Sequence, residues 1–265
     1  MKTPDFDFAS LFSIFEKSII SNIEEESYSD ILVAYSGGID STALLFFSKK
    51  IANKYNKNIR AIHINHNLNQ DAKKWELHCR DFCKEVEVEI IIKNLNIILN
   101  KGDSIEEKAR ELRYNSIYNA MNKNTVMLTA HHLEDQSETF LYQLFRGAGV
   151  TGLSSMPIVK KIDQGFHVRP FLKINKNAIS DIVNYNNLLY IDDISNDDTK
   201  FSRNYIRKKI LPIIKKRWPS YSETISRSAY NLSESMKLND DLAEIDFQNF
   251  LMKEKNKINL DVREL

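Results

Sequence analysis

Cysteine and glycine are scarce in this chain, and long apolar runs are missing. Its 265 residues include 2 cysteines and 7 glycines, and two cysteines cannot staple a chain of this size as a disulfide scaffold. No segment approaches the roughly 20 apolar residues of a membrane-spanning helix. The early acidic residues are unlike those of a secretory signal. We therefore expect a protein of the reducing cytoplasm without a membrane partner.

The chain also lacks a charge excess of either sign. Lys+Arg total 37 and Asp+Glu total 36, a formal net charge of +1, so any surface for nucleic acid has to arise from local clustering. A hydrophobic fraction of 42% and a charged fraction of 28% exclude a disordered, collagen-like or membrane-embedded chain. The length suits one large domain, or one domain with a small appendage.

Apolar runs rich in β-branched residues alternate with helical patterns over the first 150 residues. After a helix within the first thirty residues, we expect strands at 31–36, 59–65, 86–95 and 125–132, each followed by a helix. This order predicts an α/β fold, a Rossmann-like parallel sheet with helices on both faces. Beyond Gly152 we expect a strand at 167–172, a helix at 176–190 and a polar helical segment at 220–265.

The predicted domain organisation follows from this change of pattern. Residues 1–218 would form the main domain, and residues 219–265 a helical linker or the start of a C-terminal domain. Pro219 marks the boundary.

The stretch SGGIDS follows the first predicted strand and opens a helix. Gly37 and Gly38 let successive backbone N–H groups face an anion, and the helix amino terminus at Ile39 adds its dipole. Ser36 and Ser41 add hydroxyl donors, and Asp40 can reach a Mg²⁺ ion held by phosphates. The string matches neither GxxxxGK[ST] nor GxGxxG. Its place between strand and helix favours a phosphate-binding loop over a simple turn.

Other chemically active residues follow the second and fourth predicted strands. His63 and His66 suit zinc, but no third and fourth ligands are evident, so we reject a metal site there. His131 and His132 precede a helix start, where Asp135 and Glu138 lie on similar sides. Acidic residues near a helix start also satisfy the helix dipole, and this alternative stays open.

Two arginine-containing segments complete the candidates. Arg110 and Arg113 lie three residues apart on one predicted helix, so they project to similar sides. Between Thr199 and Pro219 the chain carries eight positive charges and no acid, with Tyr205 and Trp218 interleaved. That pattern favours binding to a phosphate backbone over a solvated face.

Taken together, these motifs resemble a known family. SGGIDS is similar to the loop of the pyrophosphate-loop adenylating ATPases, which cleave ATP between its α and β phosphates. The order of the further motifs resembles that of the tRNA(Ile)-lysidine synthetases within this group, over about residues 28 to 215. The motifs are HINHNLN, ARELRY, TAHHLEDQSETFL, RGAGVTGL, RPFL and SNDDTKFSRNYIRKKILP. One departure is Glu134, where the family typically has aspartate.

The resemblance implies an adenine nucleotide α-hydrolase-like fold and a ligase that forms a carbon–nitrogen bond. It would adenylate the wobble cytidine of the tRNA(Ile) with a CAU anticodon, and L-lysine would then attack through its ε-amine. ATP and Mg²⁺ are the implied cofactors, and a homodimer is compatible with the family. Asp135 is the first candidate to bind the ammonium and accept its proton, and Glu134 is the second. The implied residues are Ser36, Gly37, Gly38, Ile39, Asp40, Ser41 and His63 for ATP; Asp40, Arg113, His132 and Asp135 for catalysis; and Glu134, Asp135, Glu138, Arg110, Arg146, Arg203, Asn204 and Arg207 for lysine or tRNA.

Three alternatives remain open at this point. A tRNA thiolase also adenylates a base carbonyl but delivers sulfur, and it generally needs cysteines, whereas Cys79 and Cys83 lie on a predicted helix. A synthetase of the amidotransferase type would act on a small molecule and would not need the basic segment. A nucleotide-sensing module would bind ATP without turnover.

Overall fold

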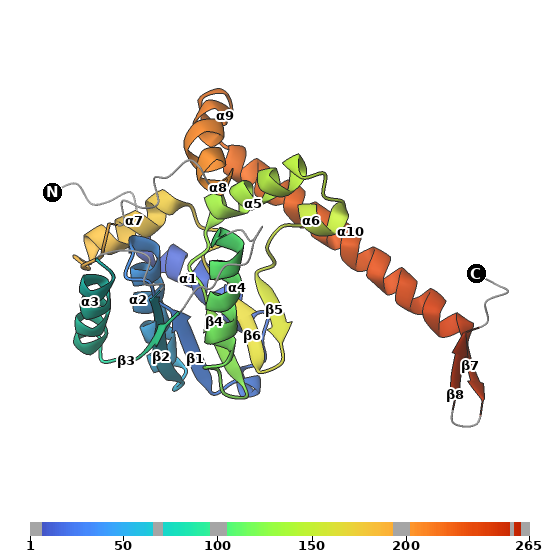
Figure 1. Ribbon diagram of the computed structural model, residues 1–265, viewed down its shortest axis with the longest axis horizontal. Helices are drawn as coiled ribbons and strands as arrows, with labels where there is room; N and C mark the ends of the chain where they lie inside the picture. The colour runs from blue at the N-terminus through green and yellow to red at the C-terminus, as the bar shows by residue number, and fades with distance from the viewer. Residues whose placement is uncertain (1–6, 66–70, 96–104, 193–201, 255–256, 261–265) are drawn as a thin grey trace.

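A six-stranded, mostly parallel sheet forms the centre of the protein (Figure 1), in a computed structural model that describes residues 7–65, 71–95, 105–192, 202–254 and 257–260. The strand order is β3-β2-β1-β4-β6-β5. Five strands run parallel, and β5 joins the edge antiparallel to β6. Their bounds are β1 Asp30–Ala34, β2 Asn58–Asn65, β3 Glu89–Asn94, β4 Thr125–Leu128, β5 Val159–Ile162 and β6 Gly165–Val168. The predicted α/β fold is confirmed.

Helices cover both faces of this sheet because its central strands are apolar on both sides. Ile31 and Val33 of β1 pack in the larger core with one set of helices, whereas Leu32 packs in a smaller core on the opposite face with Ile117. The larger core includes α1 Phe8–Ile20, α2 Ile39–Lys54, α3 Ala72–Glu85 and α7 Lys176–Tyr185; the smaller one includes the end of α4 Ile105–Tyr118. A short 3₁₀ turn, η1 Glu25–Ser27, leads into β1.

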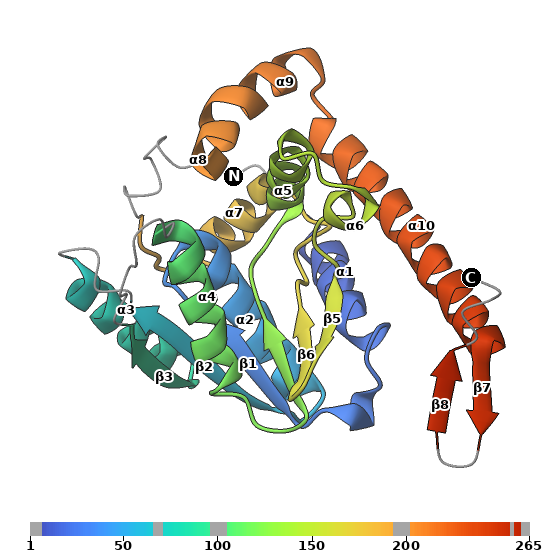
Figure 2. The ribbon, with the colours of Figure 1, turned by 45° about the vertical axis from the view of Figure 1, so that its right-hand side comes forward.

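A second group of helices stands above the carboxyl ends of the strands (Figure 2). It contains α5 Leu133–Phe145, α6 Val150–Leu153, α8 Ser202–Tyr205, the π-helical turn η3 Ile206–Ile210, α9 Leu211–Arg217 and α10 Tyr221–Phe250. Leu141 of α5 packs in one apolar cluster with Ile206, Leu211 and Tyr221. This cluster joins the basic segment and the start of α10 to α5.

The far end of α10 extends away from the sheet and carries a hairpin (Figure 1). The hairpin pairs β7 Leu251–Glu254 with β8 Lys257–Leu260. The prediction of helix throughout 220–265 is therefore wrong for 251–254 and 257–260, two short runs that each contain apolar residues. The boundary between residues 218 and 219 stays a prediction.

Several smaller expectations were also imprecise, and the helix expected at 176–190 ends at Tyr185. The fourth strand ends at Leu128 rather than at residue 132, so residues 129–132 form the loop that enters α5. The strand expected at 167–172 ends at Val168, ahead of Pro170, which cannot donate to a sheet ladder. Strand β5 was not expected. Within the part of the chain described here, we find no helix with the length and apolarity to span a membrane.

Candidate active site

The site lies where the strand order reverses. The chain runs outward from β1 to β2 and β3, then returns to place β4 on the other side of β1. Parallel sheets bind ligands beyond the carboxyl ends of their strands at such a point. The loop after β1 carries Ser36 to Ser41, and the loop after β4 carries Thr129 to His132.

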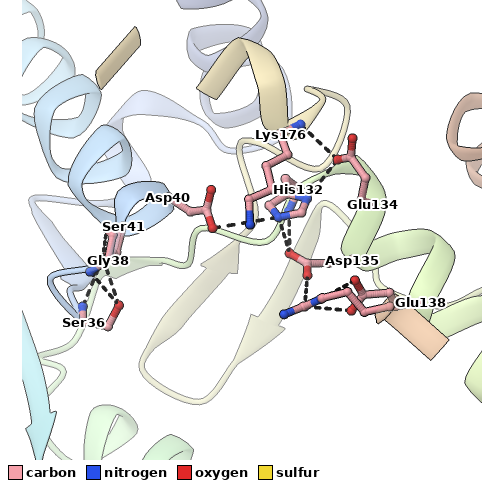
Figure 3. Close-up of polar contacts among 10 residues, drawn as sticks. Ser36, Gly38, Asp40, Ser41, His132, Glu134, Asp135, Glu138 and Lys176 are labelled. Carbon is pink, nitrogen blue, oxygen red and sulfur yellow. Dashed lines mark hydrogen bonds and ion pairs between the residues drawn. The ribbon is translucent and has the colours of Figure 1, made fainter. Parts of the chain in front are cut away.

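Internal hydrogen bonds shape the loop after β1 (Figure 3). The Ser41 hydroxyl lies 3.0 Å from the Ser36 hydroxyl, accepts from the Ser36 N–H at 3.2 Å and donates to the Gly38 carbonyl at 2.9 Å. Gly38 is the N-cap of α2 and has no side chain to occupy the first turn. The amino-terminal N–H groups of α2, which lack partners within the helix, can therefore face an anion.

Gly37 is required by its backbone and by its surroundings. Its φ is +88°, a conformation that side chains disfavour, and an added Cβ would lie 2.8 Å from Ile191 Cδ1 and 3.0 Å from Cys79 Sγ. The Gly37 carbonyl accepts a hydrogen bond of 2.8 Å from the Ile191 N–H. Ile191, which is distant in the sequence, therefore helps to hold the loop in place.

A cavity of about 610 Å³ opens beside this loop. Its wall includes five of the predicted nucleotide-binding residues of the loop, but not Gly37, together with His63 and Arg113. Trp75 of α3 and Lys176 of α7 also line it, and sequence analysis identified neither as a site residue. The buried His63 ring places Nδ1 3.0 Å from the Tyr35 carbonyl, and burial lowers the pKa of His63. We refer to this space as the loop cavity.

Asp40 is an under-satisfied carboxylate in this wall. Its Oδ1 is buried without a hydrogen-bond partner, and burial raises the pKa of Asp40 above its ordinary value. Figure 3 shows the Lys176 side chain extending toward it, and the positive charges of His132 and Lys176 act in the opposite direction on that pKa. Such an oxygen fits a divalent cation, because Mg²⁺ prefers carboxylate oxygens together with substrate phosphates.

His132 lies among three carboxylates at the start of α5. Its Nδ1 is 3.0 Å from Glu134 Oε2, and its Nε2 is 3.5 Å from Asp135 Oδ2 and 3.9 Å from Asp40 Oδ2. Burial acts to lower the pKa of His132, but these carboxylates outweigh it and raise that pKa above its ordinary value. The cluster therefore favours a protonated His132 that joins the loop after β1 to α5.

The Glu134 carboxylate joins α5 to α7. Besides its contact with His132, its Oε2 accepts a hydrogen bond of 3.0 Å from the Lys176 N–H at the start of α7. The extra methylene relative to aspartate spans this gap. The same bond fixes the helix turn from which the Lys176 side chain reaches the loop cavity.

Arg207 pairs with Glu138 and also contacts Asp135, both on α5. Its Nε donates to Glu138 Oε1 at 2.6 Å and its Nη2 to Glu138 Oε2 at 2.8 Å, while Nη2 also lies 3.2 Å from Asp135 Oδ1. Burial acts to lower the pKa of Arg207, and Glu138 and Asp135 raise it above its ordinary value. Burial acts to raise the pKa of Asp135, but His132 and its other partners lower it. Asp135 is therefore ionised at neutral pH.

These groups line a second cavity of about 330 Å³, the α5 cavity. Asp135 and Glu138 supply negative charge to its wall, and four arginines supply positive charge: Arg110, Arg113, Arg203 and Arg207. Asn204 completes the predicted residues found there. Arg113 and His131 line both cavities, so they stand at the junction between them.

The structure thus gathers most of the predicted residues and leaves one apart. Arg146 is exposed, lies 3.4 Å from Glu107 and stacks on Tyr142, and it lines neither cavity. Gly147 follows α5 with a φ of +71°, the left-handed conformation typical of a glycine that ends a helix. His66 lies outside the described residues.

Comparison with known proteins agrees with this geometry. A family model described as a PP-loop domain, an ATP-binding family, matches residues 11–214. The chain belongs to this PP-loop family. It is 43% identical over 222 residues to a tRNA(Ile)-lysidine synthase of Coxiella burnetii, covering 84% of this chain and 49% of that protein. It is 44% identical over 233 residues to a tRNA(Ile)-lysidine synthase of Buchnera aphidicola subsp. Schizaphis graminum, covering 87% and 50%.

The chain therefore spans about half the length of these curated relatives. Among solved structures, the PP-loop chain resembles a U34-tRNA thiolase from Methanococcus maripaludis with a TM-score of 0.69 and 16% identity, covering 85% of this chain and 78% of the other. That likeness supports the fold.

Proposed function

We propose that this chain catalyses the reaction of a tRNA(Ile)-lysidine synthase. ATP would adenylate the wobble cytidine of the tRNA(Ile) with a CAU anticodon, and the ε-amine of L-lysine would then displace AMP. The observation that carries the proposal is the pair of cavities that meet at Arg113 and His131. One has a wall suited to a nucleotide, and the other has a wall of paired carboxylates and arginines.

The first step takes place at the junction. The O2 oxygen of cytosine attacks the α-phosphorus of ATP, the bond to the β-phosphate oxygen breaks, and pyrophosphate leaves. The amino-terminal N–H groups of α2 and the Lys176 ammonium would hold the departing phosphates. Mg²⁺, bound through the phosphates and the unpartnered Oδ1 of Asp40, would neutralise their charge. Arg113, which lines both cavities from α4, would contact the α-phosphate.

The second step uses the α5 cavity. The lysine nitrogen attacks C2 of the base, and the C2–O2 bond breaks as AMP leaves with the former carbonyl oxygen. A lysine ammonium with a pKa of about 10.4 has to lose a proton to do so. Asp135 is our candidate to bind the ammonium and accept that proton, because it is ionised and lines the α5 cavity, where its contact with Arg207 is longer than those of Glu138. Glu134 faces His132 and Lys176 instead.

The basic segment would bind the tRNA backbone. Arg203 and Arg207 turn into the α5 cavity, while the side chains of Lys209, Lys215, Lys216 and Arg217 are exposed beside it on η3 and α9. Trp218 is 62% exposed at the end of α9, available for stacking on a base. This arrangement supports tRNA over a small-molecule acceptor, and it favours action in the cytoplasm, where tRNA is found.

The structure argues against the thiolase alternative. Cys79 and Cys83 are fully buried in α3, and burial raises the pKa of each thiol to about 12. A thiol with such a pKa is a poor nucleophile and a poor metal ligand at neutral pH. Sulfur transfer through Cys79 or Cys83 would need an exposed, ionisable thiol, which neither residue offers.

Pyrophosphate release tests the proposal and separates it from a nucleotide-binding module. The purified chain is incubated with ATP, Mg²⁺ and the tRNA(Ile) with a CAU anticodon, with and without lysine. We expect release that requires the tRNA, and AMP formation that lysine accelerates. A matched tRNA with G in place of the wobble cytidine is the control. ATP binding without release in any mixture would contradict the proposal.

A further inference from the structure

A line of hydrogen-bonding groups runs from the sheet to the junction of the two cavities. The Thr129 hydroxyl lies 2.9 Å from His131 Nδ1 and 2.9 Å from His167 Nε2. The other nitrogen of His167, Nδ1, lies 3.4 Å from Arg169 Nη2. His167 lies in β6 and Arg169 directly after it, so these hydrogen bonds join segments that are distant in the sequence.

Arg169 fixes the direction of donation at the start of this line. A guanidinium can only donate, so the nitrogen of His167 that faces Arg169 has to accept. Neutral His167 then carries its proton on Nε2 and donates it to the Thr129 oxygen. The hydroxyl that accepts from His167 still has its own proton to donate, and His131 Nδ1 lies 2.9 Å away as an acceptor for it. Donation in this direction leaves the proton of neutral His131 on Nε2.

Both histidines are neutral at physiological pH. Burial lowers the pKa of His131 to about 3 and the pKa of His167 to about 2, and the positive charge of Arg169 acts in the same direction. Arg169 is itself buried and anchored by a 2.9 Å bond from Nη1 to the Pro157 carbonyl. Because neither ring is doubly protonated, the direction of hydrogen-bond donation that Arg169 sets at His167 extends through Thr129 to His131.

We propose that Thr129, His167 and Arg169 are positioning residues that hold His131 in the tautomer with its proton on Nε2. His131 then offers a fixed hydrogen-bond donor to an acceptor oxygen of the substrate where the two cavities meet. In the reaction proposed above, on which this inference rests, two acceptors pass that point: a non-bridging oxygen of the α-phosphate and O2 of cytosine. In this tautomer His131 assists by donating a hydrogen bond and does not act as the general base.

The tautomer can be measured without any substrate. In protein labelled with ¹⁵N-histidine, two-bond ¹H–¹⁵N correlation spectra distinguish the two neutral tautomers from the charged ring. The sequence has 6 histidines, and spectra of His131→Gln and His167→Gln assign the two signals of interest. We expect both rings to carry their proton on Nε2 at neutral pH. A proton on Nδ1 of His131, or a charged ring, would overturn the inference.

Two substitutions of Thr129 then test the effect on turnover. Thr129→Val keeps the shape and removes the hydroxyl, so His131 should populate both tautomers, and kcat for pyrophosphate release should fall about tenfold to a hundredfold. Thr129→Ser keeps the hydroxyl and should restore both the spectrum and most of kcat. The KM for ATP should change little in either variant. Unchanged kcat in a folded Thr129→Val would contradict the role.

The two proposals fail in distinguishable ways. If no pyrophosphate or lysine adduct forms with any tRNA while the spectra show the expected tautomer, the proposed reaction is wrong, and the positioning of His131 by Thr129, His167 and Arg169 stands as a structural feature. If the adduct forms but His131 has the opposite tautomer, only the positioning of His131 is wrong. Arg169→Met offers a second spectral test should Thr129→Val not fold, because His167 then loses the donor that fixes its direction.

Discussion

Acidification should destabilise this fold through His167, by an amount that can be worked out. The His167 side chain is fully buried, and its pKa is lowered from 6.5 to about 2. In the unfolded chain the same ring takes up a proton near its ordinary pKa. The unfolded state then binds more protons than the folded state, so the free energy of unfolding falls as the pH falls below 6.5.

At pH 5.5, one unit below that value, His167 should lower the free energy of unfolding by about 1.4 kcal/mol relative to pH 7.5. Replacing the ring by an amide in His167→Gln removes this titration while keeping an N–H group that can reach Thr129. Other titrating groups are common to both proteins and cancel in the comparison. The quantity of interest is therefore the difference between wild type and variant in their losses of stability from pH 7.5 to pH 5.5.

Urea unfolding at the two pH values measures that difference. We expect the wild type to lose about 1.4 kcal/mol more than His167→Gln. Equal losses would refute the reasoning, because His167 would then bind its proton equally well in the folded and the unfolded states. His132→Gln is a control of opposite sign: the raised pKa of His132 gives stability that is fully present below 6.5 and lost as the pH rises through the folded pKa. Its removal should cost more stability at pH 5.5 than at pH 7.5.

Three further substitutions test separate parts of the site. Gly37→Ala places a side chain at a φ of +88° and 2.8 Å from Ile191 Cδ1, so we expect a loss of about 1–3 kcal/mol in unfolding free energy and much weaker ATP binding by calorimetry; unchanged binding would argue against the loop as the phosphate site. Lys176→Met should slow pyrophosphate release about tenfold or more, because it removes a cation near the phosphates, whereas exposed Lys173→Met should have no effect; equal rates would remove Lys176 from the mechanism. Glu138→Gln breaks the two-bond pair with Arg207, which is 40% exposed, so stability should fall by only about 1–2 kcal/mol. Because Arg207 would then pair with Asp135 alone, the KM for lysine in Glu138→Gln should rise about tenfold at constant KM for ATP, and a rise confined to ATP would place lysine elsewhere.

Local sequence patterns predicted most of the fold. β-branched runs bounded by helical periodicity located β1 to β4, and the glycine pair located the loop after β1. The edge strand β5 was missed because Val159–Ile162 is a short run with two central lysines, and its pairing with β6 is a tertiary fact. The pairing of β7 with β8 was missed for a similar reason, since the two strands are only four residues each.

The candidate site was predictable where its residues follow strands directly. Asp40, His132 and Asp135 come together because parallel strands end at one edge. Lys176 was not foreseen, since a lysine at the start of a surface helix has no distinguishing pattern. Its place in the wall of the loop cavity depends on the position of α7, where the Lys176 N–H donates to Glu134. Arg207 was expected to bind lysine or tRNA; its pairing with Glu138 depends on how the basic segment packs on α5.

The fate of the cytidine O2 oxygen distinguishes the proposed reaction from any other. In that reaction this oxygen leaves on AMP, while the tRNA gains the mass of lysine less one water. The isoleucine tRNA is prepared with ¹⁸O at O2 of the wobble cytidine and treated with ATP, lysine and the purified chain. We predict AMP that carries one ¹⁸O and a tRNA that carries one lysine. Unlabelled AMP, or a modified tRNA that keeps its ¹⁸O, would contradict the account.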